Sequence, residues 1–255
     1  MMKVWIVIYD SDTFPEQLYH RALLALDHDS VQRIRKFRKK EDACRCLIGR
    51  FLRCMVLHRR GIDPHTAVFR TTEAGKPYLS YPILHPPVAY NVAHDNAIVT
   101  ITFSSNTHNP PAYSLGIDVM KVHLPGCKSF SAFVNVMEGV VTAENADEEN
   151  LRRFFWVWTM KEAYTKAVGL GLGFDFRRVE YDAESNILRV DGARLSGWQF
   201  NKFVVKVRGD VYQGVIAQCT GGDQLEIIEG STGPANYMEV YDAVHFVENT
   251  LQQMN

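Results

Sequence analysis

Apolar residues in the first half of the chain follow two patterns, short continuous runs and recurrence every three or four positions. The recurrence predicts a helix within residues 14–27 and a longer one that begins at Asp29 or Ser30 and ends at Gly61. The continuous runs are rich in β-branched and aromatic residues. They predict strands at 4–9, 68–70, 88–92 and 97–103.

The second half repeats this order of elements. A helix is predicted from a cap at Thr142, through an acidic first turn, to about residue 168, where Gly169 ends it. Residues 238–251 predict a terminal helix. Strands are predicted at 115–119, 177–181, 187–190, 198–207 and 212–218, with a short extra strand at 225–229.

A polar loop with two prolines, residues 104–111, separates the two sets of elements. It predicts an N-terminal subdomain at 1–112 and a C-terminal subdomain at 113–255. Each half consists of a strand, a long helix and antiparallel strands. The predicted fold class is therefore α+β, with two similar subdomains in one chain, each a long helix packed on a mainly antiparallel sheet.

The composition is that of a chain that can bury a core. Of its 255 residues, 46% are hydrophobic and 22% are charged, and the formal net charge is -1. No apolar run approaches the ~18 to 20 residues of a membrane span, and the first residues lack the basic start and cleavage site of a secretory signal. The five cysteines include no CxxC pair, which argues against a disulfide framework or a zinc site. We therefore expect reduced thiols, a cytoplasmic location and no membrane partner.

Positive charge is concentrated in one stretch, residues 33–60. This stretch holds eleven lysines and arginines and two acids, a net charge of +9, whereas the other 227 residues sum to -10. Two interpretations are equally open: a site for an anionic partner, or a solvated helix face. A surface that stacks nucleic-acid bases would interleave aromatic residues, and the stretch offers only Phe37 and Phe51. No nucleic-acid partner is therefore expected.

Common catalytic motifs are missing from the sequence. It holds no GxSxG, HExxH or GxxxxGK(S/T) pattern, and the glycine-rich segment 169–173 follows a helix instead of opening one. Two acidic positions remain. Asp118 lies within an apolar strand, and Glu162 shares a helix face with Trp158 and Lys166. Taken singly, each has an ordinary explanation, since a Glu–Lys pair at this spacing is most often a surface pair worth ~0.3 to 0.5 kcal/mol.

Together, the two acidic positions resemble a motif pair of the 4'-phosphopantetheinyl transferases. Gly-Ile-Asp at 116–118 is followed about forty residues later by Trp-Thr-Met-Lys-Glu-Ala-Tyr-Thr-Lys-Ala at 158–167. The chain is similar to the longer branch of this superfamily, which includes the Sfp-like and the aminoadipate-semialdehyde dehydrogenase-phosphopantetheinyl transferases. Further matching segments lie in order at 41–45 with 49–50, 75–77, 91–94, 169–174 and 178–181.

This resemblance implies a single-chain α+β pseudo-dimer, monomeric, with coenzyme A bound between the halves. The enzyme would transfer the 4'-phosphopantetheine arm of coenzyme A to a serine of an apo acyl or peptidyl carrier protein and release 3',5'-ADP. Because the partner supplies the nucleophile, no serine or cysteine nucleophile is needed in the chain itself. The alternative is a coenzyme A or nucleotide binding module without catalysis, and the presence of Asp118, Glu162 and Lys166 argues against it.

The resemblance also implies roles for individual residues. In the C-terminal subdomain, Asp118 and Glu162 would bind Mg²⁺, or Mn²⁺, and Glu162 would also be the general base. Lys166 would neutralise the departing phosphate, and Lys161 is a less certain phosphate contact. The N-terminal subdomain would bind the coenzyme A nucleotide. The residues implied there are Lys76 and His94 with Gly75, Pro77, Asn91, Val92 and Ala93, and Arg33 and Arg45 as possible contacts of the 3'-phosphate.

The sequence departs from the family pattern at two positions. Bacterial relatives carry a second carboxylate two residues after the first, where this chain has Met120, as the animal and fungal relatives do. A two-carboxylate metal site with an extra water is therefore expected. Ala93 replaces a serine that is common in the Asn-x-Ser-His segment, so one hydroxyl contact to the nucleotide is expected to be absent. Residues 230–255 match no segment of the family pattern.

Overall fold

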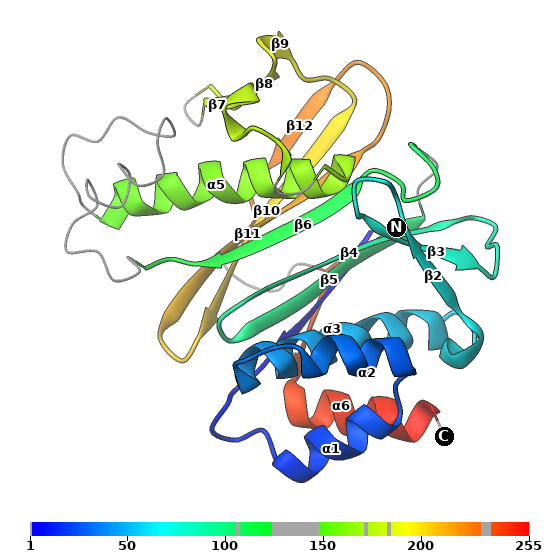
Figure 1. Ribbon diagram of the computed structural model, residues 1–255. Coiled ribbons are helices and arrows are strands. Elements are labelled where there is room, and N and C mark those ends of the chain that lie inside the picture. Colours follow the sequence, from blue (N-terminus) through cyan, green and yellow to red (C-terminus); the bar gives the residue numbers. More distant parts are fainter. Residues whose placement is uncertain are drawn as a thin grey trace.

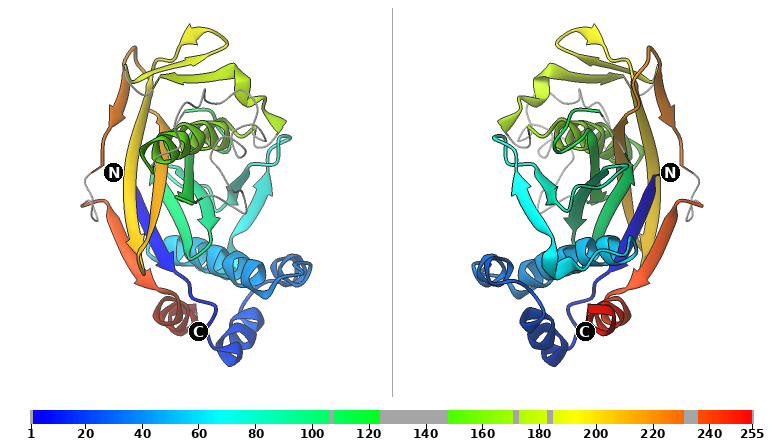
Figure 2. Two further views of the ribbon diagram at one scale, coloured as in Figure 1. Left: turned by 90° about the vertical axis from the view of Figure 1, so that its left-hand side faces the viewer. Right: turned by 90° about the vertical axis from the view of Figure 1, so that its right-hand side faces the viewer.

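In the computed structural model, the long strands lie between one long helix, α5 (Glu148–Val168), and a group of helices formed mainly by the first half of the chain (Figure 1). Figure 2 shows from two further sides that α5 lies apart from this group, with the small strands that follow α5 in the sequence beyond it. The structure describes residues 2–105, 108–123, 148–170, 173–182, 185–230 and 236–254. The predicted cap at Thr142 lies outside the described residues.

Two four-stranded sheets share one internal order. The first sheet runs β13-β1-β5-β4 and the second β12-β10-β11-β6. In both, the first strand of the half pairs antiparallel with the third, and the third pairs antiparallel with the second. This repetition confirms the predicted α+β fold of two similar halves. The strands are β1 (Lys3–Ile8), β4 (Val88–Asp95), β5 (Ile98–Ser105), β6 (Leu115–Lys121), β10 (Trp198–Val207), β11 (Asp210–Cys219), β12 (Leu225–Ile228) and β13 (Met238–Asp242).

Period-two alternation assigns the strand residues to separate cores. Val4 and Ile6 of β1 pack in a core that they share with Ile117 of β6, so the two halves are joined by apolar contact. Trp5 and Val7, on the other face of β1, pack against the helices of the first half. The sheets therefore have a shared interior and a separate helix-covered face each.

The first half contains α1 (Glu16–Leu24), α2 (His28–Arg35) and α3 (Lys40–His58). The prediction of one helix from Asp29 or Ser30 to Gly61 was wrong, because the chain leaves the helix between α2 and α3. No side chain from 35 to 42 is buried, so this basic segment gains no packing energy from a helix. The cap of α2 is Asp27, whose side chain accepts a hydrogen bond from the Ser30 amide at 2.8 Å.

Smaller elements decorate the two sheets. A hairpin projects from the first half, and its second strand was not predicted because it is short and starts with a proline. The hairpin predicted around 182–186 is present, with Asn186 at a positive φ in the turn. These elements are β2 (Val68–Thr71) with β3 (Pro77–Tyr81), β7 (Val179–Asp182) with β8 (Ile187–Val190) and β9 (Ala193–Arg194), and the short 3-10 helices Pro64–Thr66 and Phe176–Arg178.

The C-terminal residues return to the first half. The prediction of one helix over 238–251 was wrong at its start: β13 pairs parallel with β1, and only then does α6 (Ala243–Met254) begin. Phe246 and Leu251 of α6 are buried in the same core as Trp5. The division at residue 112 stays a prediction, and the structure adds that residues 238–254 pack on the N-terminal sheet.

Candidate active site

The alternation along β6 turns Asp118 away from the shared interior and towards α5. Leu115, Ile117 and Val119 are buried in the shared core, which leaves Gly116 and Asp118 on the opposite face. This is why a carboxylate can stand inside an otherwise apolar strand.

Gly116 allows α5 to lie unusually close to β6. A Cβ atom at this position would overlap with the main-chain oxygen of Ala163 and the main-chain nitrogen of Ala167. A glycine inside a strand often marks such a close approach of two backbones. The role of Gly116 was not recognised from the sequence, although this signal was present.

The close approach brings Asp118 and Lys166 into a buried ion pair. Lys166 Nζ donates to Asp118 Oδ1 at 2.6 Å, and the two side chains are 27% and 9% exposed. Burial raises the pKa of Asp118, and the Lys166 ammonium opposes this rise. Asp118 Oδ2 is buried with no hydrogen-bond partner. One oxygen of the carboxylate is thus paired and the other is available to a ligand.

Glu162 lies one helical turn before Lys166 and is itself buried, with 7% of its surface exposed. Burial raises the pKa of Glu162, the Asp118 charge adds to the rise, and Lys166 opposes it. The Lys166 charge therefore acts on both carboxylates, and the excess of negative charge favours a bound cation.

The donor set fits a divalent cation that prefers oxygen. A free buried carboxylate oxygen on Asp118 and a second carboxylate on Glu162 are the hard ligands that Mg²⁺ takes in pairs, with water and phosphate oxygens completing the shell. Within the described ranges, no three His, Cys, Asp or Glu side chains form a group that could hold a metal.

The first half contributes the side chains of His94 and Arg45 to the same region. Desolvation of the His94 ring lowers its pKa, and the charges of Arg45 and Lys166 add to this effect. Arg45 donates to the main-chain oxygen of Asn96 at 3.0 Å and to Asp42 at 3.1 Å, which holds α3 against the turn that follows β4. His94 and Arg45 of one half thus lie near Lys166 of the other.

Side chains of β4 join the two halves along β6. Asn91 Oδ1 accepts from the Ile117 amide at 2.9 Å, and Asp95 Oδ2 accepts from the Lys121 amide at 2.7 Å. Asp95 is a site residue that the sequence did not reveal, because its partner lies 26 positions away and no local pattern indicates the pairing. Between them, Ala93 is buried and Val92 is half-buried.

Lys76 lies at a different point of the junction. Its ammonium is buried and donates to three main-chain carbonyl oxygens, of Tyr113, Leu115 and Ala167. Burial lowers the pKa of Lys76 to about 7. Gly75, at φ +87, forms the turn before it, and Pro77 begins β3.

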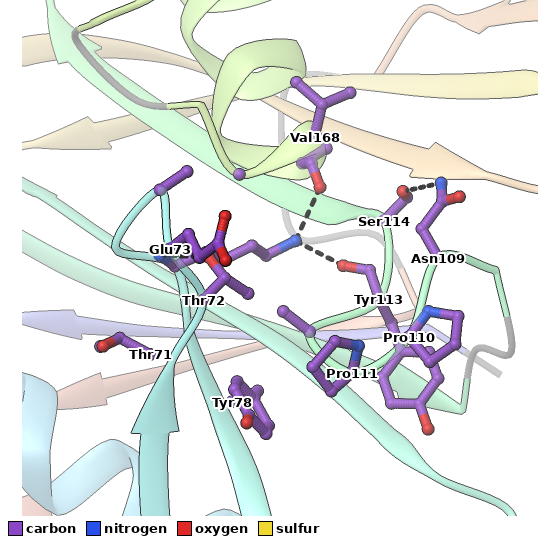
Figure 3. A pocket seen from close by; sticks show the side chains of 15 residues that line it. Thr71, Thr72, Glu73, Tyr78, Asn109, Pro110, Pro111, Tyr113, Ser114 and Val168 are labelled. Carbon is purple, nitrogen blue, oxygen red and sulfur yellow. Dashed lines mark hydrogen bonds between the residues drawn. The ribbon is translucent and has the colours of Figure 1, made fainter.

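A cavity of about 610 Å³ opens beside Lys76 (Figure 3). Thr72 and Tyr78 line it from the hairpin, Tyr113 and Ser114 from the connection between the halves, and Val168 from the end of α5. Its walls thus come from both halves of the chain.

Two of the predicted phosphate contacts lie elsewhere. Lys161 Nζ donates to the main-chain oxygen of Phe176 at 3.1 Å, and the acids nearest to it are Glu180 and Asp175. Arg33 is exposed at the end of α2, where its charge acts on Arg50. The structure therefore groups Asp118, Glu162 and Lys166 with His94 and Arg45, and leaves Lys161 and Arg33 outside this group. No helix of the described part is long and apolar enough to cross a membrane.

Comparisons with known proteins cover both halves. The family model for the N-terminal part of 4'-phosphopantetheinyl transferases matches residues 14–106, and the model for the 4'-phosphopantetheinyl transferase superfamily matches residues 114–213. The 4'-phosphopantetheinyl transferase pptA of Paxillus involutus is 42% identical over 99% of this chain and 100% of its own length. The phosphopantetheinyl transferase of a Thraustochytrium strain is 33% identical over 69% of this chain and 65% of its own length. The L-aminoadipate-semialdehyde dehydrogenase-phosphopantetheinyl transferase of Mus musculus is 27% identical over 71% of this chain and 64% of its own length.

Proposed function

The chain belongs to the 4'-phosphopantetheinyl transferase superfamily and transfers the phosphopantetheine group to carrier proteins, and we propose the particulars of that reaction. The donor is coenzyme A, the acceptor is a serine hydroxyl of an apo acyl or peptidyl carrier protein, and the second product is 3',5'-ADP. The reaction depends on Mg²⁺ or Mn²⁺. The observation that carries the proposal is the buried Asp118–Glu162–Lys166 group, which faces His94 and Arg45 of the other half.

Asp118 and Glu162 would hold the divalent ion. When bound, the ion would neutralise charge at the phosphorus under attack. The free oxygen of Asp118 and the carboxylate of Glu162 are the atoms proposed for this contact. Met120, where bacterial relatives carry a further carboxylate, leaves the chain with two acidic ligands.

Glu162 is also proposed as the acceptor of the serine proton, directly or through a water. Its raised pKa makes Glu162 a better proton acceptor than an ordinary carboxylate. The serine oxygen forms a bond to the β-phosphorus of coenzyme A, the bond from that phosphorus to the oxygen bridging to 3',5'-ADP breaks, and the proton goes to Glu162. Lys166, at the same face of α5, neutralises the charge that develops on the phosphate.

The nucleotide of coenzyme A is proposed to lie along the junction of the halves. His94 and Arg45 lie near Lys166, and we assign these two side chains to the phosphates of the nucleotide. The segments 75–77 and 91–94 would form the wall beside the nucleotide, with Asn91 and Ala93 buried in it. Arg33 and Lys161 remain weaker candidates, because their contacts point away from the Asp118–Glu162–Lys166 group.

The acceptor surface is proposed on the exposed residues of the basic stretch. Arg35, Lys36, Lys39 and Lys40 are all exposed, from the last residue of α2 to the first residue of α3. An acidic carrier would be steered to them by long-range attraction. The other interpretation of this stretch, a solvated helix face, predicts that these charges leave carrier kinetics unchanged.

Incubation with coenzyme A, Mg²⁺ and an apo carrier protein tests the proposed function. We expect the carrier mass to increase by one phosphopantetheine, with stoichiometric 3',5'-ADP in solution. The reaction with chelator, and a carrier whose acceptor serine is replaced by alanine, are the matched controls. Binding of coenzyme A without any modification of the carrier would overturn the proposal in favour of a non-catalytic module.

A further inference from the structure

The three acceptors of the Lys76 ammonium belong to three separate places in the fold. Ala167 lies in the last turn of α5, Leu115 is the first residue of β6, and Tyr113 lies in the connection between the halves. The distances from Nζ to the oxygens of Ala167 and Leu115 are 2.7 and 3.2 Å. An ammonium has three N–H donors, so these carbonyls satisfy all of them.

The contact with Ala167 lies at the C-terminal end of helix α5. The last four carbonyls of a helix have no partner within it, and a cation there also interacts favourably with the helix dipole. Thr165 O, two residues earlier, accepts from the amides of Gly169 and Leu170. Lys76 adds from the other half of the chain a donor to a further carbonyl of this end, that of Ala167.

Gly169 makes room for this side chain. It lies at φ +84, in the left-handed region, and a Cβ atom there would lie 3.2 Å from Cδ of Lys76. The glycine that stops α5 and the lysine that caps it therefore fit together.

The same contacts fix the catalytic strand and helix relative to each other. Ala167 follows Lys166 directly, and Leu115 lies three residues before Asp118 on β6. One side chain therefore holds the end of α5 to the start of β6, immediately beside the Asp118–Lys166 ion pair.

We propose that Lys76 is a positioning residue, which sets the register of α5 against β6 and so the geometry of Asp118, Glu162 and Lys166. The proposal rests on the roles assigned to these three residues under the proposed function. A phosphate contact by Lys76, as the family resemblance implies, would require the ammonium to leave its three carbonyls. The two roles predict different changes in kcat and in the KM for coenzyme A.

Lys76→Met, Lys76→Arg and Gly169→Ala are the test variants, and Lys206→Met, at an exposed position of β10, is the matched control. For positioning, we expect kcat to fall by ~10-fold or more in Lys76→Met and Gly169→Ala. The KM for coenzyme A stays within about 3-fold, and dephospho-coenzyme A loses the same fraction of kcat. Gly169→Ala keeps the lysine charge while displacing its side chain, and Lys76→Arg retains part of kcat.

Hydrogen exchange supplies a readout that does not need activity. Amides at the end of α5 and the start of β6 should lose protection in Lys76→Met and keep it in Lys206→Met. Hydrogen exchange can be measured even if the wild-type chain modifies no carrier. It therefore tests the positioning role of Lys76 separately from the proposed function. A rise in KM for coenzyme A at unchanged kcat, with unchanged exchange, would overturn positioning in favour of a phosphate contact. Unchanged kinetics and unchanged hydrogen exchange in Lys76→Met and Gly169→Ala would overturn the positioning role and the phosphate contact alike.

Discussion

Helices α3 and α5 occupy equivalent places in the two halves but meet their strands through different chemistry. Each is the long helix of its half and follows the first strand of that half. Leu47 and Phe51 of α3 are buried in one apolar core with Val99 and Ile101 of β5. The face of β6 towards α5 instead carries Gly116 and Asp118.

The difference shows how one scaffold serves two purposes. An apolar helix–strand contact stabilises the first half, and its cations lie outside the contact, at 35–40 and at Arg45. In the second half the contact itself holds two carboxylates and a lysine, and burial of carboxylates opposes folding unless they are paired. The first half therefore keeps these cations outside its helix–strand contact, and the second half places charged side chains within its own.

The largest expected effect tests the buried charge on α5. Glu162→Gln should lower kcat by ~10² or more, because the amide cannot accept the serine proton and is a poorer cation ligand. Thermal stability should stay equal or rise, since a buried carboxylate with a raised pKa is removed. Steady-state kinetics and thermal unfolding measure both. Glu149→Gln, in the exposed first turn of α5, is the control. A kcat within a few-fold of wild type would remove Glu162 from both assigned roles.

The second prediction concerns the two glycines at the helix–strand contacts. Gly116→Ala should destabilise the fold by roughly 1 to 3 kcal/mol, because its methyl group would overlap with the backbone of α5, and activity should fall with it. Gly49→Ala in α3 is the matched change. Its Cβ would meet a side-chain atom of Val92 at 3.3 Å, and a shift of that side chain relieves the contact. We therefore expect less than about 1 kcal/mol there, in view of the better helix propensity of alanine. If denaturant unfolding shows that Gly116→Ala and Gly49→Ala lose equal free energy of unfolding, α5 does not approach its strand more closely than α3 does.

The exposed charges of the first half give the third prediction. Reversal of Arg35, Lys36, Lys39 and Lys40 to glutamate should raise the KM for an apo carrier by ~10-fold at low salt and flatten its dependence on ionic strength. Loss of the Arg45 side chain should instead weaken coenzyme A binding. Kinetics from ~0.05 to 0.5 M salt separate the two effects. If carrier kinetics are independent of salt and the four reversals are silent, the stretch is a solvated face.

The smallest expected effect concerns Asp27, a carboxylate of the first half whose pKa is lowered, whereas the pKa values of Asp118 and Glu162 are raised. Burial alone would raise the pKa of Asp27, but the hydrogen bonds from Ser30 outweigh it and hold the pKa below its ordinary value. A lowered pKa in the folded state contributes stability above the unfolded pKa of ~3.9 that is lost as the pH falls through the folded value. Asp27→Ala should therefore cost about 1 kcal/mol at pH 7 and less at pH 3. Urea unfolding at the two pH values measures this difference. If Asp27→Ala loses the same free energy of unfolding at both, the Asp27 cap does not depend on the charge of the carboxylate.

Patterns that are local in sequence predicted much of the fold. Residues 198–207 form the predicted strand, and Gly169 ends the long helix as expected. The break between α2 and α3 and the start of α6 were missed, because packing against distant strands decides them. Within the site, the resemblance predicted Asp118, Glu162 and Lys166, which the structure brings together. The three main-chain carbonyl contacts of Lys76 could not be predicted, because main-chain carbonyls have no sequence signature.

The pairing of β13 with β1 also has a consequence for how the chain is made. Val4 pairs with Met238, so β1 gains this edge partner only after the strands from β2 to β12 have been synthesised. The second sheet needs no residue after β12 and can close earlier. Until α6 arrives, part of the core around Trp5 remains open to solvent. The first half to be translated is therefore the last half to be finished.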